Sequence, residues 1–163
     1  MKANSHSIAC LSNLFKMLQL QIKSFDDLTL NELHELLQLR SEVFVVEQNC
    51  VYQDIDGKDK EAMHLLGQDK SGLVAYTRIF PPGVYYNEAS IGRVLVKRSE
   101  RQHGYGYRIM EASIKAIFEH YGTCGIKISA QKYLEKFYGN LGFKPVGDDY
   151  LEDGIPHVAM VKI

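Results

Sequence analysis

Two stretches of the chain repeat their apolar residues at helical spacing. Between residues 104 and 121 the repeat consists of Met110, Ile114, Ile117, Phe118 and Tyr121. A second stretch begins after Thr29 and Glu32, which have the spacing of a helix capping box. Its apolar stripe consists of Leu33, Leu36, Leu37, Val43 and Phe44. Intervals of three and four positions predict two amphipathic helices, each with one buried face.

The segments around these helices have the pattern of β-strands. Residues 63–80 form two β-rich runs around the turn residues 69–72, which predicts a hairpin. Further strands are predicted at 17–25, 90–96, 125–130 and on both sides of the Asp153-Gly154 turn, with a third helix over 131–142. The order β-α-β-β-β-α-β-α-β-β predicts one α/β domain, residues 17–163, whose mixed central sheet is flanked by helices. Residues 1–16 show no clear period and are predicted to be a loose N-terminal extension.

Composition narrows the classes of function. The chain has 19 basic and 20 acidic residues, so no general positive field predicts binding to nucleic acid or to an anionic membrane. The chain has three cysteines, an odd number, and Cys10, Cys50 and Cys124 lack CxxC spacing. This favours a reducing compartment over a disulfide framework or a zinc site. The sequence shows neither a signal-peptide core nor an apolar run of membrane-spanning length. We expect a cytoplasmic protein without a bound metal.

Two polar residues interrupt the first helical stripe. Arg40 and Glu47 share the helical phase of the leucines, so each is expected to be paired inside the protein or to face a cavity. The next segment, QDIDGKDKE at residues 53–61, contains DxDG. It does not place the glycine and glutamate where an EF-hand calcium loop needs them. We interpret the segment as a solvated acidic turn.

A glycine turn precedes the second amphipathic helix. Arg101, Gly104 and Gly106 spell RxxGxG between a strand and a helix. Glycines let the backbone approach a ligand closely, and the free N–H groups of a first helical turn favour an anion. The GxxxxGK[ST] pattern is absent, and the dinucleotide pattern GxGxxG fails at Ile109. A pyrophosphate is the predicted occupant, with a plain strand-to-helix turn and an ATP site as the alternatives.

Four segments of the sequence resemble one known superfamily. VLVKRSERQHGYGYRIM is similar to the acetyl-CoA signature of the GNAT N-acetyltransferases, and AQKYLEKFYGNLGF resembles their second signature. LLQLRSEVFVVEQNCVYQDIDG and YLEDGIPHVAM resemble the ElaA-like family within that superfamily. The likeness runs from about Met17 to the end of the chain. It implies the GNAT fold and an acyl-CoA-dependent transfer reaction.

The resemblance also implies a binding site for acetyl-CoA. In the superfamily, the central strand holds the pantetheine arm and the glycine turn binds the pyrophosphate. The matching positions here are Val94, Leu95, Val96, Arg101, Gln102, His103, Gly104, Tyr105, Gly106, Tyr107 and Gln131. Gln131 departs from the asparagine that is frequent at its position, although its amide can still hydrogen-bond pantetheine. Tyr138 is implied as the proton donor to the departing thiolate.

The residues predicted to bind and deprotonate the acceptor are polar side chains, some of which lie in apolar stretches of the sequence. Glu47 is expected to be the general base, because a semi-buried carboxylate can have a raised pKa, with Glu152 and His157 as rivals. The candidates for acceptor binding are Arg40, Arg78, Arg93, Glu152 and His157. Arg78 and Arg93 interrupt apolar runs. If both side chains face the acceptor pocket, they favour an acceptor that carries a carboxylate.

These expectations combine into one function. We expect an N-acetyltransferase that moves acetyl from acetyl-CoA to a primary amine of a small molecule or peptide by direct attack in a ternary complex. A non-catalytic acetyl-CoA or CoA sensor with the same fold is the alternative. An exposed sheet edge leaves a homodimer open.

Overall fold

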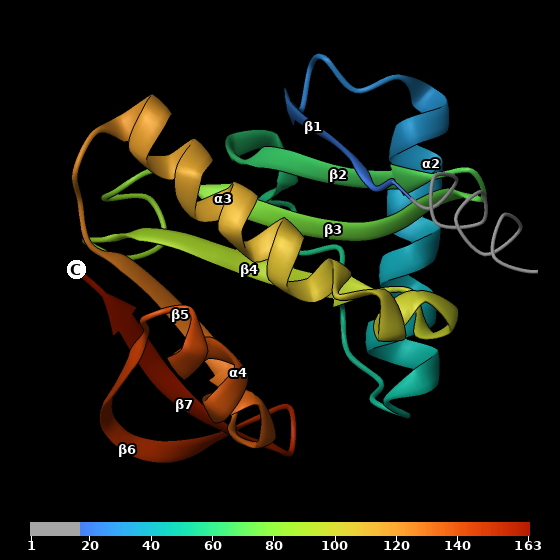
Figure 1. The fold of residues 1–163 in the computed structure, drawn as a ribbon. Coiled ribbons are helices and arrows are strands. Elements are labelled where there is room, and N and C mark those ends of the chain that lie inside the picture. Colours follow the sequence, from blue (N-terminus) through green and yellow to red (C-terminus); the bar gives the residue numbers. More distant parts are fainter. Residues whose placement is uncertain (1–16) are drawn as a thin grey trace, which may run out of the picture.

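A seven-stranded mixed sheet organises the protein, whose computed structural model describes residues 17–163 (Figure 1). The strand order is β1-β2-β3-β4-β5-β7-β6, and only β4 and β5 run parallel. The strands are β1 Gln19–Ser24, β2 Met63–Asp69, β3 Gly72–Phe80, β4 Ala89–Val96, β5 Ile126–Gln131, β6 Lys144–Glu152 and β7 Ile155–Lys162. The helices are α2 Leu30–Arg40, α3 Tyr105–Tyr121 and α4 Glu135–Asn140. The element order and the mixed sheet predicted from the sequence are confirmed.

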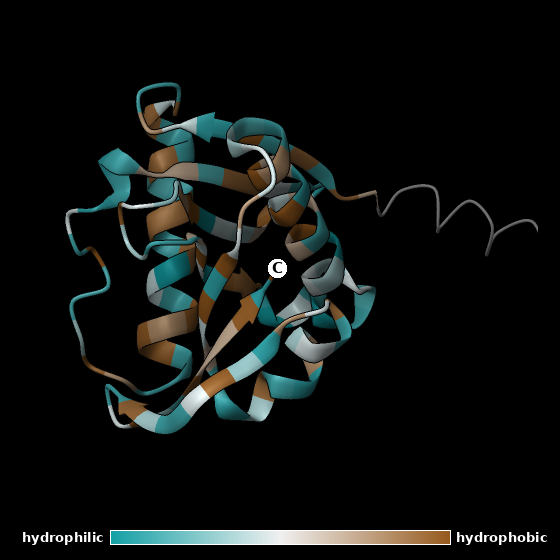
Figure 2. Ribbon diagram, turned by 90° about the vertical axis from the view of Figure 1, so that its left-hand side faces the viewer, coloured by the Kyte–Doolittle hydropathy of each residue, from teal (hydrophilic) through white to brown (hydrophobic). Residues whose placement is uncertain are grey.

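Helices α2 and α3 cover opposite faces of the sheet. Ile109 and Ile117 of α3 share a core with Ile79 of β3. Leu36 of α2 packs in another core with Tyr76, which lies on the other face of β3. Figure 2 shows helices on both sides of the strands. Because both faces of β3 are covered, this strand is buried along nearly its whole length.

The first helix begins as predicted and continues in another geometry. The Thr29 side chain accepts from the Glu32 N–H and the Glu32 side chain accepts from the Thr29 N–H, which confirms the capping box. After Arg40 the chain forms a π-helix, Ser41–Glu47, labelled η1. The wider turn of a π-helix changes the phase of the side chains that follow it. Arg40, which precedes this turn, points into the interior, whereas Glu47 at its end reaches the central cleft.

That cleft forms where β4 and β5 separate. The two strands pair only at Ala89 with Ile126 and at Ser90 with Lys127. Beyond this point the register of β4 against β3 shifts by one residue, and Arg93 has a φ of 50°. A bulge of this kind bends a strand. The part of β4 that follows Ser90 thus turns a free edge toward β5.

Two expectations about local structure need correction. The third helix is shorter than predicted, because a 3₁₀ turn over Lys132–Leu134 precedes α4 and Gln131 ends strand β5. The acidic segment is not a solvated turn, because Asp54 and Asp59 are buried.

Within residues 17–163, none of the helices combines the length and hydropathy that crossing a bilayer requires. The prediction for residues 1–16 lies outside the described residues.

Candidate active site

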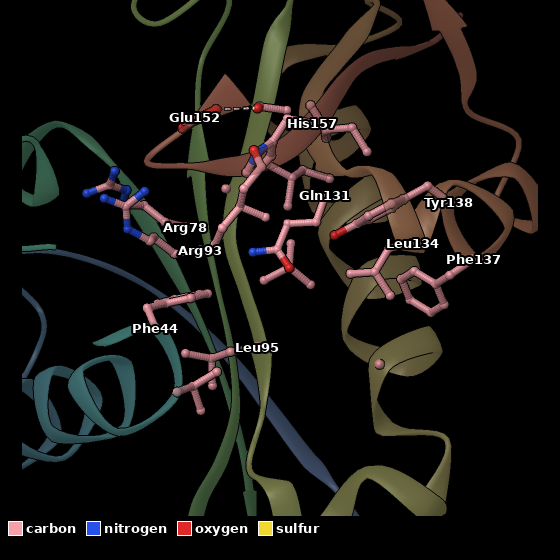
Figure 3. Close-up of a pocket in the computed structure, with 18 of the residues that line it drawn as sticks. Phe44, Arg78, Arg93, Leu95, Gln131, Leu134, Phe137, Tyr138, Glu152 and His157 are labelled. Atoms are coloured by element: carbon pink, nitrogen blue, oxygen red, sulfur yellow. Dashed lines mark hydrogen bonds between the residues drawn. The ribbon is translucent and has the colours of Figure 1, made fainter. Parts of the chain in front are cut away.

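A cavity of about 590 Å³ occupies the split between β4 and β5 (Figure 3). Its walls come from η1, β4, the start of α3, β5, α4 and the β6–β7 turn. The predicted site residues that line it are Glu47, Arg78, Arg93, Val94, Leu95, Val96, Arg101, Gly104, Gly106, Tyr107, Gln131, Tyr138, Glu152 and His157. Those that do not line it are Arg40, Gln102, His103 and Tyr105. Most of the candidates from distant parts of the chain therefore meet in one cavity.

The glycine turn has the geometry that an anion site needs. Residues Arg98–His103 form a 3₁₀ helix, η3, which ends at Gly104. Gly104 has a φ of 71°, and nothing lies within 4 Å of the position that a Cβ would take. No side chain caps the N–H groups at the start of α3, so they remain donors for a phosphate. Gly106 packs instead against the ring of Phe137, 3.5 Å from its ideal Cβ.

Arg101 is held by Glu47. Arg101 Nη1 and Nη2 lie 2.5 and 3.0 Å from the two carboxylate oxygens, and Arg101 Nε donates to the Val96 carbonyl at 3.1 Å. This pair joins the end of η1 to the glycine turn. Glu47 is expected from the sequence either to be paired or to face a cavity, and it does both: it lines the cavity and is paired with Arg101. Its partner is not Arg40.

The residues after Glu47 continue across the cavity, and we call residues 47–50 the cleft strap. Gln48 accepts a hydrogen bond from Gln131 Nε2 at 3.1 Å, and Cys50 Sγ donates to the Asp153 carbonyl at 3.6 Å. The strap thus contacts η3, β5 and the β6–β7 turn. Both Arg101 and Gln131, predicted contacts of the acyl donor, are bonded to it.

Tyr138 reaches the cavity from α4. Its side chain packs edge-on against Phe137 and Phe143 and is buried, whereas Figure 3 shows its hydroxyl directed toward the cavity. Within residues 17–163 the hydroxyl has no protein hydrogen-bond partner. Burial raises the pKa of Tyr138 well above its usual value, with a smaller contribution from Tyr133. The phenol therefore keeps its proton at neutral pH.

Three arginines and three aspartates form a charge-balanced network beside the cavity, which we call the arginine–aspartate cluster. Asp59 Oδ1 accepts from Arg40 at 2.7 Å and from Arg78 at 2.8 Å. The remaining contacts are Arg40 with Asp54 at 2.8 Å, Arg78 with Asp56 at 2.7 Å, and Arg93 with Asp54 at 2.6 Å and with Asp56 at 3.6 Å. The segment interpreted as a solvated turn is thus the anionic half of a buried network. Its signal in the sequence was the coincidence of three aspartates in one loop with three arginines in apolar surroundings.

This network changes the interpretation of Arg78 and Arg93. Both line the cavity, as the carboxylate-acceptor hypothesis requires, but aspartates already bind their guanidinium groups. Arg40 is fully buried and lies outside the cavity wall. A substrate carboxylate would have to displace an aspartate, so the geometry does not favour that hypothesis.

The remaining polar groups come from β5, β6 and β7, and we call them the acceptor corner: Ser129 on β5, Tyr150 and Glu152 on β6, and His157 on β7. Ser129 Oγ donates to Glu152 at 2.6 Å and lies 2.5 Å from the Tyr150 hydroxyl. The Tyr150 ring stacks on His157. Aromatic side chains at Phe44, Tyr52, Phe80, Tyr85 and Tyr86 also line the cavity, and Figure 3 shows Phe44 near Leu95. Sequence reasoning missed Ser129, Tyr150 and the tyrosines. Tyr52 and Tyr150 lie in segments that resemble the ElaA-like family, but no local feature marked any of these residues as part of a site.

The fold agrees with the comparisons to known proteins. The model of the acetyltransferase (GNAT) domain matches residues 26–163. The chain belongs to this family of acyltransferases.

Its relatives include proteins of the ElaA group. Protein ElaA of Escherichia coli is 40% identical over 148 residues, which cover 90% of this chain and 97% of that protein. A UPF0039 protein of Synechocystis is 44% identical over 138 residues, covering 84% of this chain and 90% of the relative. The crystal structure of an acyl-CoA N-acyltransferase from Pseudomonas aeruginosa is 40% identical and matches with a TM-score of 0.85, over 90% of this chain and all of that one. The predicted superfamily and the ElaA-like resemblance are confirmed.

Proposed function

We propose that the protein transfers an acetyl group from acetyl-CoA to a primary amine of a small molecule or peptide. The observation that carries this proposal is the convergence of the uncapped glycine turn, the free edge of β4 and Tyr138 on one cavity. The turn is suited to the pyrophosphate because Gly104 leaves open space and the first N–H groups of α3 lack a cap. Backbone groups at Val94 to Val96 would hold the pantetheine arm and the thioester carbonyl.

The residues of the cavity then have separate tasks in the transfer. The amine nitrogen attacks the thioester carbonyl directly, a C–N bond forms and the C–S bond breaks. Backbone N–H groups of β4 stabilise the negative charge that develops on the carbonyl oxygen. The Tyr138 hydroxyl donates a proton to the thiolate that leaves. Catalysis consists of orientation, charge stabilisation and proton transfer, without a covalent intermediate on the protein.

Ligand-induced thermal stabilisation tests the first half of the proposal. Acetyl-CoA and CoA should each raise the melting temperature, because a ligand that binds only the folded state stabilises it. ATP should have a much smaller effect. Stabilisation by ATP alone would assign the turn to a nucleotide instead.

Turnover tests the second half. A panel of primary amines, read by the release of free thiol from acetyl-CoA, should contain at least one acceptor. Binding of CoA without thiol release in any mixture would favour the sensor. The free thiols Cys50 and Cys124 are consistent with a reducing cytoplasm as the site of action. Pairing of two copies through an edge strand, β1 or β6, stays a prediction.

A further inference from the structure

The geometry of His157 assigns its proton. The side chain is only 8% exposed, and its Nδ1 lies 2.8 Å from the Ile155 carbonyl oxygen. A carbonyl accepts and never donates, so Nδ1 must carry a hydrogen. In the neutral ring this leaves Nε2 with a lone pair, and within residues 17–163 Nε2 has no hydrogen-bond partner. The imidazole lines the cavity in the form that accepts a proton.

The strand register places His157 beside the acyl donor. His157 on β7 lies directly opposite Gln131 on β5, and Ser129 is two residues earlier on β5. Cross-strand partners and residues two apart share one face of a sheet. His157 therefore faces the same side as Gln131, the predicted pantetheine contact. Figure 3 shows His157 and Glu152 at one end of the cavity and Tyr138 across from them.

The charges on the cavity wall favour a cation at this end. Every arginine that lines the cavity has a carboxylate partner: Arg78 and Arg93 in the arginine–aspartate cluster, and Arg101 at Glu47. Glu152 and Asp153 also line the cavity, and within the described chain neither is in an ion pair. Among the residues that the structure describes, only Ser129 donates a hydrogen bond to the Glu152 side chain, so most of its acceptor capacity is left for a ligand.

The aromatic wall beside the acceptor corner favours an apolar body next to that cation. Tyr85 and Tyr86 lie on the loop between β3 and β4 and line the cavity with Tyr52 and Phe80. Burial raises the pKa of Tyr86 to about 12, with contributions from Tyr85, Tyr150 and Glu152. Tyr86 is therefore neutral at pH 7 and near Glu152. Lys58 and Lys127 already lie over the Tyr85 and Tyr86 rings, 4.4 and 4.8 Å from the ring centroids, so the rings offer a ligand apolar surface. Apolar surface beside the Glu152 carboxylate suits an ammonium group attached to an apolar or aromatic chain.

We propose that the acceptor is a primary ammonium ion without a neighbouring carboxylate, that Glu152 binds it, and that His157 Nε2 takes its proton before attack. This inference rests on the proposed acyl transfer. It assigns the general base to His157 in place of Glu47, whose carboxylate is engaged by Arg101.

The protons of the transfer balance with these roles. The ammonium group loses one proton to His157, which passes it to solvent, and the neutral amine then forms the C–N bond. The nitrogen loses a second proton to solvent as the C–S bond breaks, and Tyr138 gives its own proton to the thiolate. Tyr138 then takes one proton back from solvent. The products are an amide, the free thiol of coenzyme A and one proton in solution.

Two matched amines test the acceptor class. Tyramine and tyrosine differ only in the carboxylate next to the amine. With wild-type protein and acetyl-CoA, kcat/KM for tyramine should exceed that for tyrosine by at least about tenfold, because each arginine on the wall already has a carboxylate partner. Equal use of both, or preference for tyrosine, would overturn the assignment of the acceptor.

Two substitutions test the roles in the acceptor corner. Glu152→Gln keeps an oxygen for Ser129 and removes the charge, so the KM of the amine should rise about tenfold while that of acetyl-CoA stays within about threefold. His157→Gln should slow turnover by about 10² to 10⁴ with little change in the KM of acetyl-CoA. The controls are Glu111→Gln and His120→Gln, two exposed positions on α3 outside the cavity, and both should behave as wild type. Unchanged turnover in a folded His157→Gln protein contradicts the assignment of the base.

A measurement without an acceptor separates this inference from the proposed function. Imidazole ¹⁵N spectra of the wild-type protein, assigned with His157→Gln, should show His157 with hydrogen on Nδ1 and none on Nε2 at pH 8. Addition of CoA should shift these signals, since His157 lies opposite Gln131. Hydrogen on Nε2 would refute the base assignment even if transfer occurs. Failure of every amine in the panel, with the expected spectrum, would count against the transfer itself.

Discussion

Glu47 and Arg101 form a two-point ion pair across the mouth of the cavity, although 54 positions separate them in sequence. The sequence assigned these residues to different tasks, Arg101 to the pyrophosphate and Glu47 to the acceptor amine. In the structure the Glu47 carboxylate binds the Arg101 guanidinium group through two hydrogen bonds. If the glycine turn binds a pyrophosphate as proposed, that group and the Glu47 carboxylate compete for one guanidinium group.

Removal of the Glu47 charge should strengthen the binding of CoA. In Glu47→Gln the pyrophosphate no longer competes with a carboxylate, and partly exposed ion pairs contribute about 0.2 to 1 kcal/mol. We expect the Kd of CoA from calorimetry to fall about two- to fivefold, with a smaller change in the turnover rate. Arg101→Gln, the matched change on the other partner, should weaken CoA binding instead. If turnover by Glu47→Gln fell by about two orders of magnitude or more at unchanged Kd, as the loss of a general base predicts, Glu47 would return to the role of base.

Tyr138→Phe should slow the transfer without weakening the binding of acetyl-CoA. The ring contacts with Phe137 and Phe143 remain, and only the proton donor is lost. General acids typically contribute about 10² to 10⁴ in rate, and we expect the lower end because a thiolate is a good leaving group. An acyl donor with a more acidic thiol should lose less rate. Normal turnover would reduce Tyr138 to a packing residue. Tyr121→Phe, at the end of α3 and outside the cavity, is the control.

Gly104→Val should abolish binding of acetyl-CoA and leave a folded protein. The φ of 71° strains any residue with a Cβ, and the new side chain would fill the open space above the turn. Gly72→Val is the matched control, because Gly72 also has positive φ and open space but lies in the β2–β3 turn outside the cavity. We expect similar melting temperatures for both variants and loss of CoA binding, by calorimetry, only in Gly104→Val. Intact affinity in that variant would refute the assignment of the turn.

Asp59→Asn should destabilise the fold, because Asp59 bridges Arg40 and Arg78 in a buried site. The breaking of a buried ion pair typically costs about 3 to 5 kcal/mol, which urea denaturation measures. Asp149→Asn, at an exposed pair with Lys132, should cost little. A loss at Asp59 below about 1 kcal/mol, the value typical of an exposed pair, would show that the cluster does not stabilise the fold.

The same carboxylate should make stability depend on acid. Burial alone would raise the pKa of Asp59, but hydrogen bonds and charge from Arg78 and Arg40 outweigh it, so the pKa lies below its usual value. The stabilisation is present above the unfolded-state pKa of about 3.9 and is lost as the pH falls from there through the lower folded-state pKa. Thermal denaturation between pH 6 and pH 2 should show this loss in wild type and a smaller one in Asp59→Asn.

The sequence by itself determined the features that depend on neighbours along the chain. The capping box at Thr29, the turn at Asp153-Gly154 and the order of strands and helices all follow from local periodicity and turn chemistry, which the chain carries without reference to distant parts. The glycine turn was also legible, because a positive φ at Gly104 and an uncapped helix start are properties of a few adjacent residues.

Only the tertiary structure decided which charges meet. Glu47, at the end of the π-helix that follows Arg40, lies against Arg101. The loop that contains Asp54, Asp56 and Asp59 lies against three arginines and balances their charge. Both outcomes depend on contacts between residues far apart in sequence, and a charged side chain fits a solvated surface, a buried pair or a binding site equally well until its partner is known. The arginines of the cavity wall are paired with carboxylates from distant segments. Glu152 and His157 are therefore the groups of the acceptor corner that we propose for the acceptor amine, and no local pattern in the sequence could have shown this.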